Sequence, residues 1–438
     1  MTSLRFRLAA IALAISPAAA RAQSAPLASA ADSAALARNA WSSAVKAIRA
    51  KDMDAAQREV DRAAAAWPVQ PSYHWYRAVI AAGRRDTAAL RSALTSYASL
   101  GLGRSLADTA FDSFRTSQWF KEVAARHEAN RRTLVHSRTR LQLGDSTLWP
   151  EGVDYDSRSG RFYVTSVRHR TIVEVSRDGT ERDMWPRNTP GIGAVLGVRV
   201  DPRRDVLWAS TSALSQMSGF TPADSNAAAL LEVRISDGKI LRRWDLPRTS
   251  GHVLGDVTVG PRGDVFISDS FDPVLYRLKP GADSLQTIRS PLFRSLQGTA
   301  PSADGNAIYV ADYSHGLLHV DLSTGQAHRV ADATGSTSVG LDGIAWFDNS
   351  IIAIQNGIAP ARVVRLRLSS DGMRVDRAQV LDQNSDVADE PTAGTVIHGT
   401  REFVYVANSQ WEKYTDNGTR KTSVPLTRPL LLTIPLDR

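Results

Sequence analysis

The chain has 438 residues, no cysteine, and 53 basic against 45 acidic residues, which gives a formal net charge of +8. The absence of cysteine excludes a disulfide scaffold, a lipid-modified cysteine and thiol catalysis. Lysine and arginine are spread without a dense run, so we expect no nucleic-acid partner, and the length exceeds that of one ordinary domain.

The first 22 residues have the pattern of a secretory signal peptide. Two arginines precede an apolar run over 8–20, and small residues stand before the expected cleavage site. The run is shorter than the roughly 20 residues that a spanning helix needs, and Pro17 interrupts it. We therefore expect export to the periplasm or the medium, without a membrane span, and a flexible linker over 23–32.

Residues 33–133 are expected to form an all-α domain. Apolar residues recur at three- and four-residue spacing, and short polar or proline-containing joints separate the expected helices. These helices cover 34–49, 52–66, 72–83 and 86–99. An offset of about 34 residues relates two stretches and pairs Asp52 with Asp86, which resembles the tetratricopeptide repeat. Such repeats present a concave face to a peptide or protein, so a protein partner is one expectation and packing against the neighbouring domain is the other.

Residues 137–438 change to the period of two that is typical of strands. Six segments each combine an alternating apolar strand, a turn with Gly, Asp or Pro, and a second strand rich in aromatic and β-branched residues. Their first strands begin near Val153, Val198, Val257, Thr299, Ile344 and Thr395. Two further strand-like runs follow each pair, so the pattern predicts an all-β six-bladed β-propeller.

The two ends of this domain are expected to share one blade. The last strand, 429–435, would be the third strand of blade six, and 139–143 would supply its fourth. Such a closure removes the free sheet edges that otherwise invite aggregation.

Aligning the six units predicts one channel-facing position in each blade. These positions are Glu151, Leu196, Gly255, Gln297, Asp342 and Ala393. Three of them carry carboxylate or amide oxygens, which are the ligands that a hard cation prefers.

Three motifs resemble blade motifs of the senescence marker protein and gluconolactonase family, whose members are also called regucalcin-like. They are Pro150-Glu151-Gly152, Leu341-Asp342-Gly343 and the block from Ser302 to Asp312. The resemblance implies a channel with a divalent cation, calcium first and zinc or manganese as alternatives. It implies that Glu151 and Asp342 are metal ligands, and that Gln297 stands where the family has Asn. Gly255 replaces a residue that is often polar in the family, and Asp256 beside it is a candidate to compensate.

The resemblance also implies hydrolysis of a small lactone or ester, since a bound cation can polarise a carbonyl and lower the pKa of a water. The expected catalytic residues are Asp342 and, as groups that assist water, His252 or Asp256. His169 and His315 lie on the same expected face, with a solvated loop histidine as the other interpretation. Propellers host many functions, so a non-catalytic scaffold that binds a ligand or a protein remains the alternative.

Three loops are expected at the mouth of the channel. Residues 211–229 are expected over blade two, 408–424 with Trp411 and Tyr414 beside blade six, and 389–391 with Glu390 at the mouth itself. Solvated connections are the other interpretation of these loops.

Overall fold

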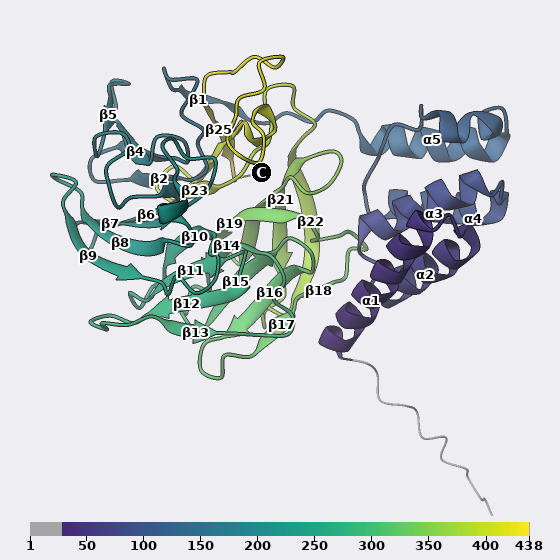
Figure 1. Ribbon diagram of the computed structural model, residues 1–438, viewed down its shortest axis with the longest axis horizontal. Coiled ribbons are helices and arrows are strands. Elements are labelled where there is room, and N and C mark those ends of the chain that lie inside the picture. Colours follow the sequence, from purple (N-terminus) through teal and green to yellow (C-terminus); the bar gives the residue numbers. More distant parts are fainter. Residues whose placement is uncertain (1–28, 438) are drawn as a thin grey trace, which may run out of the picture.

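The computed structural model describes residues 29–437, which form a group of helices beside a ring of sheets (Figure 1). The expected signal peptide and the start of the expected linker lie outside the described residues. Across 29–437, no helix combines the length and apolarity that crossing a membrane requires.

The helical segment lies where the sequence predicts it. Its elements are α1 (Ala30–Arg49), α2 (Met53–Ala66), α3 (Pro71–Gly83), α4 (Thr87–Ser99), the short 3-10 helix η1 (Thr109–Phe114) and α5 (Gln118–Asn130). Helix α1 begins inside the stretch expected as linker, because Ser29 and Asp32 form a capping box that satisfies backbone donors at its first turn. Alanines at 34, 37, 40 and 44 form its buried face, so α2 can pack closely against it.

The two helical hairpins use the same turn. Lys51 and Arg85 both have a positive φ, 60° and 59°, at the end of the preceding helix. The Asp52 and Asp86 side chains then each accept a hydrogen bond of 2.9 Å from a backbone N–H of the following helix. The offset of about 34 residues is therefore visible in the backbone, whereas the resemblance to tetratricopeptide repeats stays a prediction.

The expected six-bladed β-propeller is confirmed by six sheets, in which every pair of neighbouring strands but one is antiparallel. Blade one contains β2 (Val153–Asp156), β3 (Arg161–Ser166), β4 (Thr171–Val175) and β5 (Glu181–Asp183). Blade two contains β6 (Ala194–Asp201), β7 (Val206–Ser212), β8 (Ala228–Arg234) and β9 (Ile240–Asp245). Blade three contains β10 (Leu254–Val259), β11 (Val265–Asp269), β12 (Val274–Leu278) and β13 (Gln286–Ile288).

The remaining blades complete the ring. Blade four contains β14 (Leu296–Pro301), β15 (Ala307–Asp312), β16 (Gly316–Asp321) and β17 (Ala327–Arg329). Blade five contains β19 (Leu341–Phe347), β20 (Ser350–Gln355), β21 (Arg362–Leu368) and β22 (Arg374–Gln383). Blade six contains β23 (Gly394–Ile397), β24 (Glu402–Val406), β25 (Leu430–Pro435) and β1 (Arg138–Gln142).

The first strands of the blades contact one another in the closed order β2, β6, β10, β14, β19 and β23, and so surround the channel. Apolar clusters fill the spaces between neighbouring blades. In one of them Trp208 of blade two packs with Ile267 of blade three, and in another Val164 of blade one packs with Leu431 of blade six. Because each cluster belongs to two blades, the core holds the ring together as well as each sheet.

The predicted closure is confirmed, because β1 pairs with β25 and places Arg138 opposite Thr433. One blade departs from the expected four strands. A short strand, β18 (Ala331–Asp332), leaves the connection between blades four and five and pairs in parallel with β22. The alternation used for the prediction does not detect a two-residue strand.

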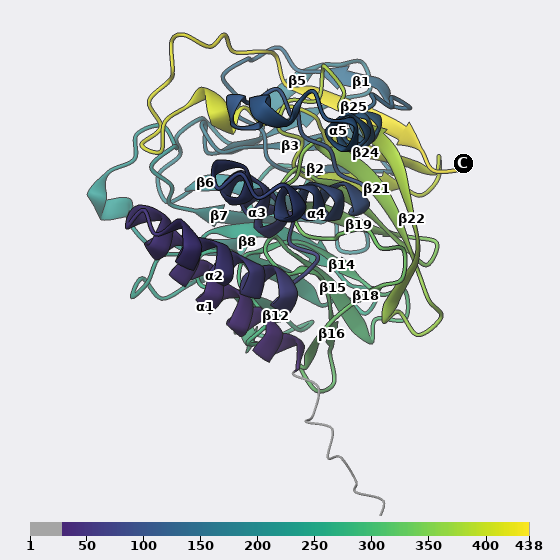
Figure 2. The ribbon, with the colours of Figure 1, turned by 90° about the vertical axis from the view of Figure 1, so that its right-hand side faces the viewer.

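The helices lie against one side of the propeller. They are at the right of Figure 1 and in front of the sheets in Figure 2. The contact is polar at several points. Thr337 donates a hydrogen bond of 2.7 Å to the Val69 carbonyl, and the Gln383 side-chain amide donates to the carbonyls of Asn130 and Arg132 at 3.0 and 2.9 Å. These bonds hold the helical segment on blades four and five.

Candidate functional site

The channel brings the carboxylates of Glu151 and Asp342 into one electrostatic environment. Burial raises the pKa of Glu151 well above its ordinary value, and the charge of Asp342 is the next cause. Burial also raises the pKa of Asp342, with the charge of Asp256 as a further cause. No lysine, arginine or histidine of the described residues contributes to either shift. Two of the three predicted metal ligands therefore act on each other electrostatically, without a basic side chain that offsets the rise in either pKa.

Asn356, directly after β20, completes the environment of Asp342. Its amide nitrogen donates to Asp342 Oδ2 at 2.6 Å and to the Pro391 carbonyl at 2.8 Å. Because both donors of the amide point at acceptors, Oδ1 is the remaining acceptor, and it is buried without a partner among the described residues. A buried oxygen without a donor is costly. Asn356 was not among the residues predicted for the site, although it is a polar residue directly after the second strand of its blade.

Glu151 is positioned from blade six. Trp411, in the 3-10 helix η3 (Trp411–Lys413), donates from Nε1 to Glu151 Oε2 at 2.7 Å. The Trp411 ring packs edge-on against Trp149 with centroids 4.9 Å apart, and Trp149 stacks on Tyr414 at 4.1 Å. Three aromatic rings therefore form an apolar wall beside the carboxylate, two of them from the loop predicted to lie beside blade six and Trp149 from the connection between β1 and β2.

Glu390 and Tyr313 extend the site toward the mouth. Burial raises the pKa of Glu390 to about 6, and its carboxylate accepts the Glu412 backbone N–H at 2.9 and 3.1 Å. Burial and the charges of Asp342 and Glu390 raise the pKa of Tyr313 to about 12. The Tyr313 hydroxyl therefore stays protonated at neutral pH and is available as a donor.

Asp256 differs from the other carboxylates because its hydrogen bonds come from the neighbouring first strand, β14. Its Oδ2 accepts the backbone N–H of Thr299 at 2.8 Å and the Thr299 hydroxyl at 3.2 Å. Burial raises the pKa of Asp256, while the charge of Arg199 lowers it. Asp256 thus joins blade three to blade four, a bond that alignment of the channel positions did not suggest.

The other predicted residues have contacts outside the pair of carboxylates. The Gln297 amide nitrogen donates to the Ser295 hydroxyl at 3.2 Å, and no hydrogen bond joins Gln297 to Glu151 or Asp342 among the described residues. His252 is buried, with Nδ1 2.6 Å from Asp269 Oδ2 and Nε2 3.1 Å from the Pro247 carbonyl. Both ring nitrogens of His252 therefore face protein acceptors, away from Glu151 and Asp342.

A glycine follows the channel position in five of the six blades. A Cβ on Gly152 would lie 2.4 Å from the Leu196 carbonyl oxygen, and one on Gly298 would lie 2.6 Å from the Asp342 carbonyl oxygen. The first strands therefore approach too closely for a side chain. Blade three is the exception, with Asp256 at this position.

Within residues 29–437, no three Asp, Glu or His side chains gather closely enough to hold a metal ion by themselves. The candidate donor set instead combines the two carboxylates with the unpartnered Asn356 amide oxygen. This set contains oxygen alone, which suits calcium or manganese better than zinc.

No protein-family model matches the chain, and no curated protein matches it. The chain is similar to several solved structures. A gluconolactonase from Xanthomonas campestris is 17% identical over 70% of this chain and 93% of its own, with a TM-score of 0.46. The calcium-binding protein regucalcin from Agrobacterium tumefaciens is 16% identical over 68% and 98%, with a TM-score of 0.47. Virginiamycin B lyase from Staphylococcus aureus is 14% identical over 69% and 89%, with a TM-score of 0.43. Similarity at this level concerns architecture alone.

Proposed function

We propose that this protein binds a divalent cation, calcium first, at the mouth of its channel and hydrolyses small lactones or esters there. The observation that carries the proposal is the pair Glu151 and Asp342, two carboxylates without a cationic partner among the described residues, beside the unpartnered oxygen of Asn356. Like charges that are partly withdrawn from water repel each other, so a cation between them lowers the free energy of the folded state.

The chain's own residues have separate roles in this proposal. The bound cation would polarise the carbonyl of the substrate and lower the pKa of the attacking water. Asp342 Oδ2 accepts from Asn356, which leaves Oδ1 as the atom that can hold the proton of that water. The protonated Tyr313 hydroxyl is the nearby donor for the leaving oxygen. The wall of Trp149, Trp411 and Tyr414 excludes bulk water beside Glu151.

A binding function without catalysis is the second candidate. Leu196, Gly255 and Ala393 occupy three of the six channel positions and supply no acid, base or charged group. This composition favours a channel that holds a ligand without transforming it.

One experiment separates the two candidates. Calorimetry of the purified chain with Ca²⁺, Mn²⁺ and Zn²⁺ would be combined with a panel of lactones and aryl esters, for wild type and for Asp342→Asn. The control is Asp371→Asn, which removes a carboxylate from an exposed turn of blade five. We expect cation binding and hydrolysis in wild type and control, and loss of both in Asp342→Asn. Cation binding without hydrolysis supports the second candidate. If wild type binds no cation and its hydrolysis does not depend on Asp342, both proposed roles of the site are contradicted.

A further inference from the structure

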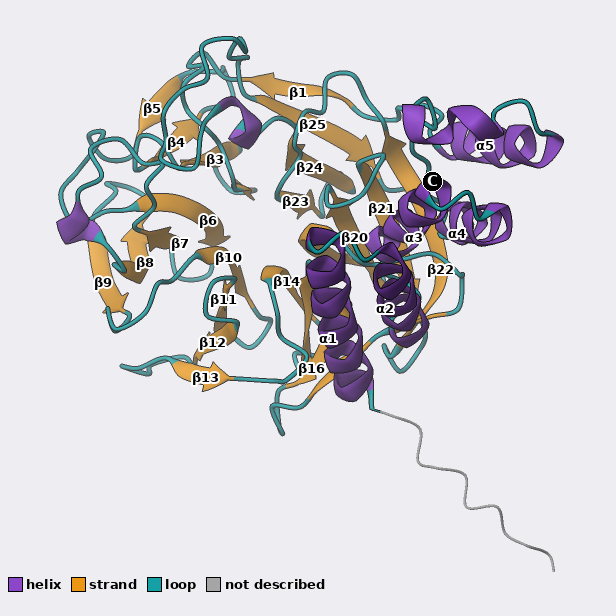
Figure 3. Ribbon diagram, turned by 45° about the vertical axis from the view of Figure 1, so that its right-hand side comes forward, coloured by secondary structure: helices purple, strands orange, loops and turns teal. Residues whose placement is uncertain are grey.

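A pocket of about 570 Å³ lies between the helical segment and the propeller. Helix α1 forms one side of it, near β14 and β16 in Figure 3, and the start of α3 and two propeller loops form the other. Its size is within the range of sites that hold small molecules. It shares no lining residue with the channel site, so a ligand here would be independent of the proposed hydrolysis.

The lining is strongly basic. Arg38, Lys46 and Arg49 of α1 and Arg294 of the propeller line the pocket, and no aspartate or glutamate does. None of these four side chains forms an ion pair with another described residue, whereas Arg138, Arg187 and Arg242 of the propeller do. Lys46 and Arg49 lie in the last turn of α1, where the helix dipole favours positive charge. That effect does not account for Arg38 in the middle of the helix or for Arg294 in the other domain.

Arg38 is held in place by His315. The His315 Nδ1 lies 2.6 Å from the Leu292 carbonyl, which is an acceptor, so Nδ1 carries a proton. The other ring nitrogen, Nε2, lies 3.0 Å from Arg38 Nη1 and accepts from it. This tautomer uses the lone pair of His315 to fix a guanidinium at the boundary of the two domains, without neutralising its charge.

Aromatic rings provide the apolar part of the pocket. Trp41 and Tyr73 line it and pack together with centroids 5.6 Å apart. Trp67 also lines it and lies 5.5 Å from His315, with the Arg329 guanidinium over its ring at 5.0 Å. Flat rings beside unpaired cations are a combination that suits a ligand with a flat body and a negative charge.

We infer that this pocket binds a small organic anion, with an aromatic body against Trp41 and Tyr73 and a carboxylate, sulfonate or phosphate group beside the cationic side chains of the lining. A ligand there contacts both domains. Its negative charge offsets the repulsion among the four cations, and the arginines can bind it through two parallel hydrogen bonds.

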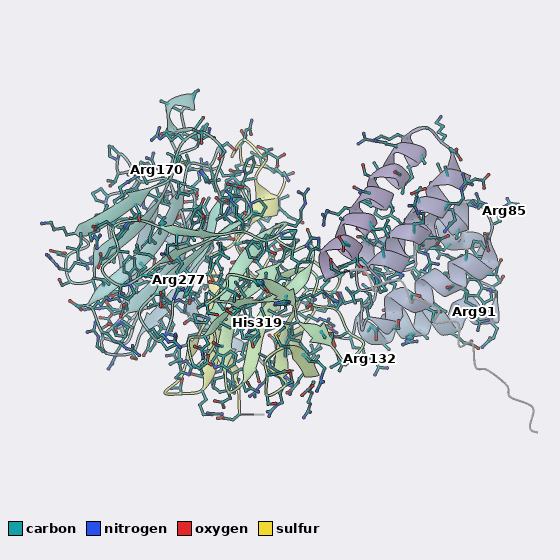
Figure 4. All side chains as sticks on the ribbon, turned by 90° about the horizontal axis from the view of Figure 1, so that it is seen from below. Arg85, Arg91, Arg132, Arg170, Arg277 and His319 are labelled. Carbon is teal, nitrogen blue, oxygen red and sulfur yellow. The ribbon has the colours of Figure 1, made fainter. Side chains whose placement is uncertain are left out.

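The test uses two fluorescent probes of similar shape, the anion anilinonaphthalene sulfonate and the uncharged phenylnaphthylamine, with the full chain. Arg38→Gln combined with Arg49→Gln removes two of the charges. The control is Arg91→Gln on α4, on the side of the helical segment away from the propeller (Figure 4). We expect the anion to bind wild type and the control equally and the double variant at least about tenfold more weakly, since a hydrogen bond to a charged group contributes on the order of 1.5 kcal/mol or more.

The uncharged probe identifies the reason for any loss. Its affinity should be unchanged in the double variant if the pocket is intact, and an unchanged melting temperature confirms that the variant folds. The inference is overturned if the anion does not bind wild type, or if all three proteins bind it equally. It is also overturned if a polyglutamate peptide binds through the same arginines while the small anion does not, because the pocket would then serve an acidic protein.

Discussion

Trp411 donates a hydrogen bond of 2.7 Å to Glu151, joining the last blade to the first at the mouth of the channel. The bond lowers the pKa of Glu151 against the larger effect of burial, which raises it. It therefore favours the carboxylate form that a cation requires. The same ring also packs on Trp149, so Trp411 has both an electrostatic and a packing role.

The two roles of Trp411 are separable with Trp411→Phe, which keeps an aromatic ring and removes the donor. We expect Ca²⁺ affinity to fall by about tenfold, the loss of one hydrogen bond to a charged group. The pH at which binding begins should also rise, because the pKa of Glu151 rises further. Calorimetry between pH 5 and 9 measures both effects. Trp119→Phe in α5 is the control, and equal binding curves for the two variants would contradict the electrostatic role.

The stability of the cation-free protein should fall as the pH rises. Glu151 and Asp342 have pKa values raised by burial, so the folded state holds their protons more tightly than the unfolded state. Their favourable contribution is complete below the unfolded pKa values and is lost as the pH rises through the folded ones, at about 1.4 kcal/mol for each unit of difference.

Calcium should reverse this loss, because it binds the ionised pair. Thermal unfolding at pH 5 and pH 9, with Ca²⁺ or with a chelator, measures the effect. We expect Ca²⁺ to raise the melting temperature at pH 9 and to have little effect at pH 5. In a Glu151→Gln, Asp342→Asn double variant, the pH dependence of stability and the effect of Ca²⁺ on the melting temperature should both become smaller. An unchanged Ca²⁺ effect in that variant would place the cation elsewhere.

Asp256→Asn tests whether Asp256 is catalytic or structural. The amide oxygen can still accept from Thr299, and removal of the charge takes away one cause of the raised pKa of Asp342. We expect hydrolysis to persist, with its acid limb moved to lower pH. A loss of turnover with unchanged Ca²⁺ affinity would instead assign Asp256 to the reacting atoms.

Gly298→Ala tests the close approach of the first strands. The new Cβ would lie 2.5 Å from the Ile344 backbone nitrogen and 2.6 Å from the Asp342 carbonyl oxygen. Relief of that clash requires movement of the strand that carries Asp342, so we expect a cost of about 1–3 kcal/mol in unfolding free energy and weaker Ca²⁺ binding. Gly399→Ala is the matched control, because no atom lies within 4 Å of its added Cβ. Equal denaturation midpoints would show that the strands can move apart without cost.

The six blades were predictable because each repeats one local pattern, and the joining of β1 to β25 follows from counting strands. The sharing of one environment by Glu151 and Asp342 follows from the same repeat, since equivalent residues of a ring must face its centre. Two local features were not predicted from the pattern. Strand β18 has too few residues to alternate, and the capping box at Ser29 extends α1 into a stretch rich in small residues.

The partners in the site were harder to predict, since they come from loops. Trp411 and Glu390 were expected at the mouth, but nothing in the local sequence says that one donates to Glu151 and the other influences Tyr313. The sequence places His252 beside the channel, but its side chain forms a hydrogen bond with Asp269. Such choices depend on which acceptor lies nearest in space.

The pairing of β1 with β25 has a consequence for the order of events during synthesis. The mouth of the channel needs Glu151 from the first blade and Trp411 from the last, and the ring closes only when β25 reaches β1. The site therefore comes into existence in a single late step, after translation of the final blade, and a partly made chain has no competent channel.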